Sequence, residues 1–301
     1  MEKSVVLEIK NVSKSFGRKK VIDDINLQVK EGEIYGFVGP NGAGKTTTIK
    51  MILGLLSIDK GNITINGYDI EKKFEKAMEN IGGIVENPDM YGYLSGMENL
   101  KLYAKIRNIN QERINEVVEL VGLTDRIKDK VQKYSLGMKQ RLGLALTLLH
   151  NPKVLILDEP TNGLDPVGIK QLRDLLKNIS HKQNVAVFVS SHMLAEMEQM
   201  CDVITIIDKG KIIETKDIKE VLEQKEETTE YIMNLSPTEK ALEILGDAAK
   251  IVDEKIHIKY KEEEMPKLVR KLVKEKINIY EISIKSSTLE EAFFDITGGD
   301  K

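Results

Sequence analysis

The sequence predicts an α/β fold built on a mixed sheet, followed by a small α+β domain. Three observations indicate this fold. A glycine-rich segment separates an apolar strand from an amphipathic helix in "FVGPNGAGKTTTIKMILGLL", residues 37–56. An unbroken aliphatic run ends in two acids in "KVLILDEP", residues 153–160. Short strand-like and helix-like segments alternate over residues 231–301, which is typical of a separate domain that contains both kinds of element.

Composition narrows the class of protein. With 301 residues the chain is long enough for two domains. Its 45 basic and 48 acidic side chains give a net charge of -3, so nothing indicates nucleic acid as a partner. There is a single cysteine, the first residues lack the apolar core of a signal peptide, and no apolar run approaches the roughly 20 residues that cross a bilayer. We expect a cytoplasmic protein whose membrane role comes through a partner.

Residues 1–222 are the predicted first domain. Alternating apolar residues in "VVLEIKNV", "INLQV" and "NITING" predict an antiparallel sheet that leans on a parallel core. From about residue 86 to 149 the pattern becomes helical, which predicts a helical subdomain. Within it, four residues of "RINEVVELVGL" share one helix face: Ile114, Val117, Val118 and Val121.

The glycine-rich segment matches the phosphate-loop pattern G-x-x-x-x-G-K-[ST] in full over residues 39–46, and a helix is predicted over 46–56. Its glycines let backbone N–H groups point inward, and the helix adds the positive end of its dipole. Lys45 is expected to reach the β- and γ-phosphates of ATP, and the Thr46 hydroxyl to hold Mg²⁺. The residues expected around the nucleotide are Gly39, Asn41, Gly42, Ala43, Gly44, Lys45, Thr46 and Thr47. An ordinary glycine-rich turn is the alternative, which the complete pattern disfavours.

The aliphatic run at 154–157 predicts a parallel strand covered on both faces, and open α/β sheets bind ligands at the carboxyl ends of such strands. Asp158 and Glu159 emerge at that end. Asp158 is expected to complete the Mg²⁺ shell, and Glu159 to orient or deprotonate the attacking water. Two solvated acids at a strand end are the alternative, but the phosphate loop in the same chain favours a site.

A further apolar run, "VAVFVSSH", ends at His192. His192 follows Glu159 by 33 residues, about the length of one helix and one strand, so both side chains can project from the same sheet edge beside the γ-phosphate. A structural, hydrogen-bonded histidine is the competing interpretation. We predict catalytic roles for Lys45, Glu159 and His192.

The charge run "EQKEETTE", residues 223–230, is the predicted linker. Beyond it, residues 231–301 form the predicted accessory domain, whose segments approximate a βαββαβ sandwich followed by a last helical segment, "STLEEAFFDITG". These segments carry no catalytic constellation. We expect a regulatory or dimer-supporting role for this domain.

The order of the motifs resembles that in nucleotide-binding subunits of ATP-binding cassette (ABC) transporters. The resemblance rests on the phosphate loop and on three further motifs: Asp158-Glu159, "NGLD" at 162–165 and Ser191-His192. It covers about residues 5–220 and implies a P-loop NTPase domain of the ABC type. The family signature, usually L-S-G-G-Q, stands here as "YSLGM" at 134–138, followed by "KQR".

The signature implies a second anion site. Ser135 is expected to cap the helix that follows, with its hydroxyl and the Gly137 amide at the positive end of the helix dipole. In the family this site closes over the γ-phosphate held by the other subunit, so two head-to-tail copies enclose two ATP molecules. By the same resemblance Asp165 spans the dimer interface, and Phe16 stacks on adenine, with core packing as its alternative.

Glu86 stands where the family usually has a glutamine that touches Mg²⁺ and senses the membrane partner. A carboxylate remains a ligand for a hard cation but adds negative charge near the γ-phosphate. This substitution and the "YSLGMKQR" signature resemble the branch that exports bacitracin and lantibiotic peptides. Tyr91, Tyr93 and Leu94 lie where the coupling helix of the permease usually docks, although core packing is the alternative for them.

The resemblance implies an ATP-hydrolysing subunit, on the cytoplasmic face of the membrane, that powers a separate exporter of antimicrobial peptides or drugs. The implied partners are a transmembrane permease and a second copy of the chain, with ATP and Mg²⁺ bound and no nucleic acid. A soluble ABC ATPase that acts on ribosomes or DNA is the alternative; one uninterrupted cassette without sustained heptads argues against it. A nucleotide switch without turnover would leave Glu159 and His192 unexplained.

Overall fold

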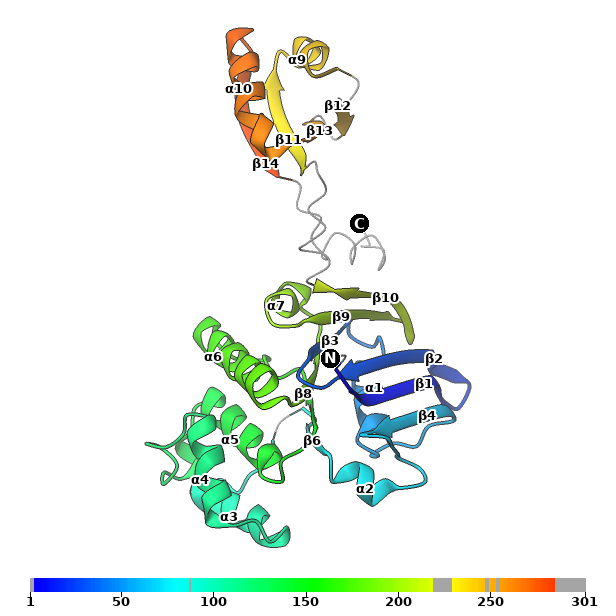
Figure 1. Ribbon diagram of the computed structural model, residues 1–301, viewed down its shortest axis with the longest axis vertical. Coiled ribbons are helices and arrows are strands. Elements are labelled where there is room, and N and C mark those ends of the chain that lie inside the picture. Colours follow the sequence, from blue (N-terminus) through cyan, green and yellow to red (C-terminus); the bar gives the residue numbers. More distant parts are fainter. Residues whose placement is uncertain (1–2, 87, 219–228, 247–248, 253–254, 285–301) are drawn as a thin grey trace. The chain divides into compact units, whose positions relative to one another are not determined.

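The computed structural model describes residues 3–86, 88–218, 229–246, 249–252 and 255–284 (Figure 1). Contacts divide the chain into two compact units, Met1–Ile218 and Lys219–Lys301. Each unit has its own hydrophobic core. The predicted domain boundary at residue 222 lies outside the described residues.

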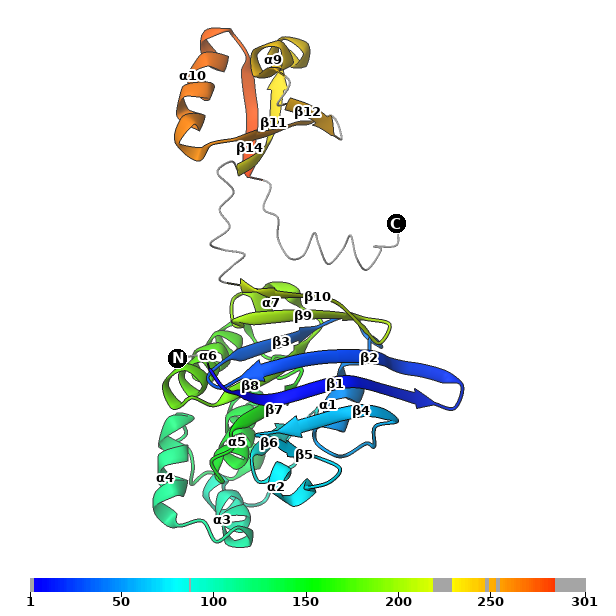
Figure 2. The same cartoon turned by 45° about the vertical axis from the view of Figure 1, so that its right-hand side comes forward.

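Four strands of the first unit form an antiparallel sheet in the order β2-β1-β4-β5 (Figure 2). They are β1 (Val5–Phe16), β2 (Lys19–Lys30), β4 (Lys60–Ile65) and β5 (Tyr68–Asp69). In β2 the apolar residues Ile25, Leu27 and Val29 are buried and the polar residues between them are exposed, because successive side chains of a strand point to opposite faces. The predicted antiparallel sheet is confirmed.

The second sheet has six strands in the order β10-β9-β3-β8-β7-β6. They are β3 (Ile34–Val38), β6 (Ile81–Ile84), β7 (Val154–Asp158), β8 (Ala186–Ser191), β9 (Val203–Asp208) and β10 (Lys211–Asp217). All neighbours are parallel except β10, which pairs antiparallel with β9 at the edge. Every residue of β3, β7 and β8 is buried, as expected for central strands covered on both faces. The mixed α/β fold is confirmed.

The helices of the first unit pack around these strands (Figure 1). They are α1 (Lys45–Ile52), α2 (Phe74–Met78), α3 (Gly96–Ile106), α4 (Gln111–Leu120), α5 (Leu136–Leu148), α6 (Pro166–Lys177) and α7 (Leu194–Glu198), with the shorter segments η1 (Val131–Lys133) and η2 (Asn178–Lys182). Over the residues that the structure describes, no helix is both long and apolar enough to cross a membrane.

Helices α3, α4 and α5 contact one another and form the predicted helical subdomain. The four apolar residues assigned to one face of "RINEVVELVGL" are buried there, as the sequence predicts. The predicted helix over 46–56 is too long, however, because α1 ends at Ile52. Gly54 adopts a left-handed φ of 67° two residues later, and glycine in this conformation commonly terminates helices.

An aromatic cluster joins the central strands of the second sheet. The ring centroid of Phe188 on β8 lies 5.8 Å from that of Tyr35 and 5.3 Å from that of Phe37, both on β3. Phe37 and Phe188 are fully buried. Aromatic rings bury large apolar areas and prefer offset or tilted contacts at such distances, so this cluster holds the two strands in register.

Over its described residues, the second unit contains two helices and one antiparallel sheet in the order β12-β13-β11-β14. Its elements are β11 (Thr229–Ser236), α9 (Thr238–Leu245), β12 (Ala249–Val252), β13 (Lys255–Tyr260), η4 (Glu262–Glu264), α10 (Met265–Lys274) and β14 (Asn278–Ile284). The helices and strands follow the predicted βαββαβ sequence. Their apolar faces meet in a core that includes Met233, Ile256 and Leu272.

Strand β11 starts earlier than the sequence predicts. β11 begins at Thr229, inside the predicted linker, because its backbone pairs with β13 from Thr229 opposite Tyr260 onward. The rest of the linker and the last helical segment, "STLEEAFFDITG", lie outside the described residues.

Replacing Phe188 by alanine is expected to destabilise the first unit by about 3–5 kcal/mol, since the buried ring leaves a cavity between β3 and β8. Urea unfolding of the nucleotide-free protein measures this change. Phe16→Ala is the matched control, because its ring is 51% exposed, and it should shift the free energy of unfolding by no more than about 0.5 kcal/mol. Equal losses in the two variants would contradict the assigned core.

Candidate functional site

The phosphate loop connects β3 to α1, and its backbone requires glycine at two positions. A Cβ at Gly39 would clash with the carbonyl oxygen of Ile207, and one at Gly44, where φ is 114°, would clash with the side chain of Ile22. The loop therefore passes closer to neighbouring strands than any larger residue would allow. Since α1 begins at Lys45, the loop amides lie at the positive end of the helix, where anions bind.

Lys45 ties this loop to the acid that follows β7. Its Nζ donates hydrogen bonds to the carbonyl oxygens of Gly39 (2.7 Å) and Pro40 (3.2 Å). The same Nζ lies 3.3 Å from Oε1 of Glu159. An ammonium has three N–H donors, so these three contacts can engage all of them.

Asp158 ends β7 and is buried. Ser190 is its register partner on β8, and Ser190 Oγ donates a 2.6 Å hydrogen bond to Asp158 Oδ1. The N–H of Glu159 donates to the same Oγ at 3.0 Å. Sequence reasoning missed Ser190. Its one signal is a hydroxyl that directly follows the apolar run of β8, two residues before His192.

Glu159 has a left-handed backbone, with φ of 49°, which is uncommon for a residue with a side chain. Its Oε2 accepts a 2.8 Å hydrogen bond from Nδ1 of His192. His192 follows β8 directly, so the adjacent carboxyl ends of β7 and β8 bring the two side chains together. The structure thus places Lys45, Glu159 and His192 in one connected cluster.

A cavity of about 400 Å³ lies against this cluster. Its lining residues are Val21, Asn41, Gly42, Gly44, Lys45, Thr46, Thr47, Glu159, Asn162 and His192. Val21 and Asn162 were not singled out by sequence reasoning; Asn162 belongs to the "NGLD" motif, and Val21 comes from β2. Three predicted site residues do not line the cavity and are buried: Gly39, Ala43 and Asp158. The lining combines loop amides, a cation, hydroxyls and one carboxylate, which suits a phosphorylated ligand.

Phe16 and Glu86 do not line this cavity. Phe16 ends β1 with its ring exposed, and Lys14 Nζ lies 5.8 Å from the ring centroid. Glu86 follows β6, has a left-handed φ of 61°, and points its Oε1 to within 4.0 Å of Lys50 Nζ. Stacking by Phe16 and metal binding by Glu86 stay predictions.

The signature segment caps α5, as the sequence predicts. Ser135 Oγ accepts a hydrogen bond from the N–H of Met138 at 3.3 Å. Asp165 caps α6 in the same way, with Oδ1 accepting from the N–H of Gly168 at 2.7 Å. Within one copy of the chain, the lining of the cavity does not include Ser135, Gly137 or Asp165.

The donor atoms present suit Mg²⁺. This cation prefers oxygen ligands, and nucleotide sites hold it with one or two carboxylates together with substrate phosphates. Thr46 offers a hydroxyl on the cavity wall and Asp158 a carboxylate at the end of β7. In the described parts of the chain, no three His, Cys, Asp or Glu side chains cluster as they would around a metal held by protein alone. The oxygen atoms of Thr46 and Asp158 are of the kind that binds a cation together with phosphates.

Comparison with known proteins gives the family. Residues 22–162 match the family model described as "ABC transporter". The chain is 49% identical over 298 residues to the uncharacterized ABC transporter ATP-binding protein YhcH of Bacillus subtilis (strain 168), covering 98% of this chain and 97% of that protein. It is 40% identical over 303 residues to the bacitracin transport ATP-binding protein BcrA of Bacillus licheniformis, covering 98% of each.

The lantibiotic transport ATP-binding protein SrtF of Streptococcus pyogenes is 39% identical over 212 residues, which cover 70% of this chain and 91% of that protein. A solved structure of an ATP-binding subunit of an ABC transporter aligns with a TM-score of 0.64 and 30% identity, over 73% of this chain and 92% of that one. These relatives confirm the ABC-type ATPase fold and the resemblance to the bacitracin and lantibiotic branch. The chain belongs to the ABC transporter family and is an ATP-binding subunit with ATPase activity.

Proposed function

We propose that this chain is the energy-supplying subunit of an exporter for antimicrobial peptides or related drugs, and that it works with a separate membrane-spanning permease at the cytoplasmic face of the membrane. The cluster of Lys45, Glu159 and His192 at one cavity is the observation that carries the ATPase part. The export part rests on similarity to BcrA, which extends over 98% of this chain and so includes both of its compact units.

In this proposal the phosphates of ATP bind the loop amides and Lys45. Thr46 and Asp158 would hold Mg²⁺, which when bound neutralises phosphate charge and orients the γ-phosphate. His192 holds Oε2 of Glu159 by a hydrogen bond, which fixes the plane of that carboxylate. Oε1 of Glu159 then receives the proton of the water that attacks the γ-phosphate.

Two copies of the chain are needed to complete the site. Ser135 Oγ accepts from the N–H of Met138, so its own O–H remains a donor for a phosphate oxygen. This hydroxyl and the Gly137 amide lie at the N-terminus of α5, which attracts anions. A head-to-tail dimer would set this turn against the γ-phosphate held by the other copy. ATP then joins the copies, and hydrolysis releases them.

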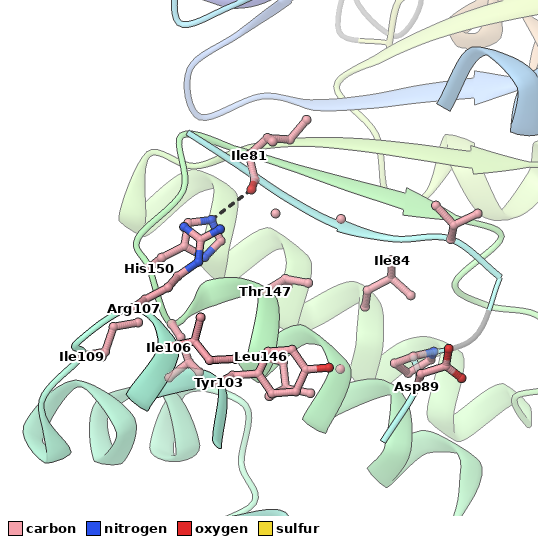
Figure 3. Close-up of a pocket in the computed structure, with 16 residues that line it drawn as sticks. Ile81, Ile84, Asp89, Tyr103, Ile106, Arg107, Ile109, Leu146, Thr147 and His150 are labelled. Carbon is pink, nitrogen blue, oxygen red and sulfur yellow. Dashed lines mark hydrogen bonds between the residues drawn. The ribbon is translucent and has the colours of Figure 1, made fainter. Parts of the chain in front are cut away.

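The permease contact is proposed at a groove beside β6. A cavity of about 350 Å³ opens there between β6, α3 and α5 (Figure 3). Apolar side chains dominate its lining, among them Ile84, Tyr103, Ile106 and Leu146. Ile106 is 79% exposed, an unusual exposure for a large apolar side chain next to a cavity, and exposed apolar patches commonly mark protein contacts.

Polar groups and aromatic rings complete this surface. The Nε2–H of His150 donates to the carbonyl oxygen of Ile81 at 2.9 Å, as Figure 3 shows, and burial, with nearby Arg107, lowers the pKa of His150. Arg107 is therefore the cation of the groove at neutral pH. Tyr91 and Tyr93, which follow the lining residue Asp89 in the chain, are exposed, and their ring centroids lie 5.8 Å apart in an edge-to-face contact. An apolar helix of the permease with an acidic residue would match these features.

Replacing Glu159 by glutamine is expected to slow ATP hydrolysis by about 100-fold or more, because the water loses its proton acceptor while the nucleotide still binds. Gel filtration with saturating Mg-ATP should then show a stable dimer. Lys45→Ala is the control, since it removes the phosphate contact and should leave the chain monomeric. A Glu159→Gln variant that stays monomeric at saturating ATP would contradict the head-to-tail mechanism.

Replacing Ile106 by aspartate is expected to reduce recovery of the permease at least about tenfold, since a charge enters the apolar groove. The measurement is mass spectrometry of membrane proteins that copurify with the tagged chain from detergent extracts of its own host. Basal ATPase activity should stay within about twofold, because Ile106 does not line the nucleotide cavity.

Ile213→Asp is the matched control for the groove. Ile213 is 42% exposed on β10, at the opposite edge of the sheet from β6, and this variant should retain the permease. Equal recovery from both variants would contradict the proposed groove. Copurification of ribosomal proteins in place of a permease would favour the soluble alternative.

A further inference from the structure

Ser190 is a buried polar residue in the most apolar part of the molecule. It lies on β8 after Val187, Phe188 and Val189, all of which are 0% exposed, as Ser190 is itself. Neighbouring strands cover it on both sides, because β8 pairs with β3 and with β7. A buried hydroxyl is unfavourable unless it is hydrogen-bonded. Its partners therefore indicate what the serine does.

Those partners are the two acids of the proposed catalytic site. The Ser190 hydroxyl has one proton, which it donates to Oδ1 of Asp158 at 2.6 Å. The Ser190 Oγ also accepts the N–H of Glu159 at 3.0 Å. The bond to the carboxylate has the short length of a charge-assisted hydrogen bond. One hydroxyl thus fixes the side chain of Asp158 and the backbone of Glu159 at once.

The second bond holds Glu159 where its backbone departs from the strand. β7 ends at Asp158, and Glu159 turns to a left-handed φ of 49°. From this position the carboxylate reaches Lys45 and His192. The N–H of Glu159 is anchored by Ser190 Oγ instead of by a strand neighbour, so the hydroxyl supports the conformation that aims the carboxylate.

We propose that Ser190 is a positioning residue of the ATPase, whose hydroxyl fixes the metal-binding carboxylate of Asp158 relative to the water-activating carboxylate of Glu159. This inference rests on the proposed roles of the two acids. With Oδ1 engaged by Ser190, Oδ2 is the oxygen that Asp158 would offer to a bound cation. Loss of the hydroxyl leaves a buried carboxylate oxygen of Asp158 and the N–H of Glu159 without this shared partner, which allows both acids to move.

The neighbouring serine provides a matched control. Ser191 is also 0% exposed, but its Oγ accepts the N–H of Met193 at 3.0 Å and bonds to neither acid. The Ser191→Ala variant therefore also loses a buried serine hydroxyl from β8, but it keeps the hydroxyl that links the two acids.

The experiment compares Ser190→Ala, Ser190→Thr and Ser191→Ala with the unaltered chain. Ser190→Ala is expected to lower kcat by about 10–100-fold and to weaken Mn²⁺ binding in the presence of ATP, measured by electron paramagnetic resonance, by a similar factor. ATP binding in EDTA should be unchanged. Ser190→Thr keeps a hydroxyl and should recover a large part of both losses, while Ser191→Ala should stay close to the unaltered chain.

Hydrogen exchange gives a readout that needs neither metal nor turnover. A peptide that contains Glu159 should exchange its amide protons faster in Ser190→Ala than in Ser191→Ala, because only the first variant frees the N–H of Glu159. If Ser190→Ala does not fold, Ser190→Cys replaces it, since a thiol is a weak donor of similar shape.

Unchanged kcat and Mn²⁺ binding in a folded Ser190 variant without the hydroxyl would overturn the inference, as would equal losses in Ser191→Ala. Either result would leave the proposed function intact if the unaltered chain hydrolyses ATP and Glu159→Gln does not. Absence of hydrolysis by the unaltered chain together with its permease would overturn the proposed function and this inference together.

Discussion

The carboxyl ends of β3, β7 and β8 lie side by side at one edge of a sheet whose central strands are buried on both faces. Slipping one of these strands by a residue would turn its side chains to the wrong face and break the aromatic cluster between β3 and β8. The core thus fixes the register, and the register decides that the phosphate loop, the two acids and the histidine meet. The geometry of the site therefore depends on packing in the core of the sheet.

Much of this fold is readable from the sequence because its strongest signals are local. The strands that end in Asp158 and Ser191 are long apolar runs, and the phosphate loop has fixed spacing. Element ends were less predictable. α1 stops before Gly54, where a Cβ would clash with the ring of Phe74, a residue from a later segment of the chain. β11 extends into a charged run, because pairing with β13 outweighs composition there.

In the candidate site, too, local sequence patterns predict some residues, and others depend on contacts between distant segments. The number of residues between Glu159 and His192 was enough to predict that both lie at one edge of the sheet, because it matches the length of one helix and one strand. Ser190 could not be found this way, because its role depends on which residue of β7 faces it. Glu86 lies toward Lys50 because of a left-handed backbone after β6, and the residue pattern does not encode that conformation.

The contacts of Lys45 have a consequence for the proposed reaction. Its three N–H donors face two loop carbonyls and the carboxylate of Glu159, so an arriving triphosphate has to displace at least one of them. In the proposed mechanism, exchange of the Glu159 contact for a phosphate oxygen would free that carboxylate to accept the proton of the attacking water. Under that proposal Lys45 would link phosphate binding to the availability of Glu159, since one Nζ contacts both the phosphate loop and the carboxylate.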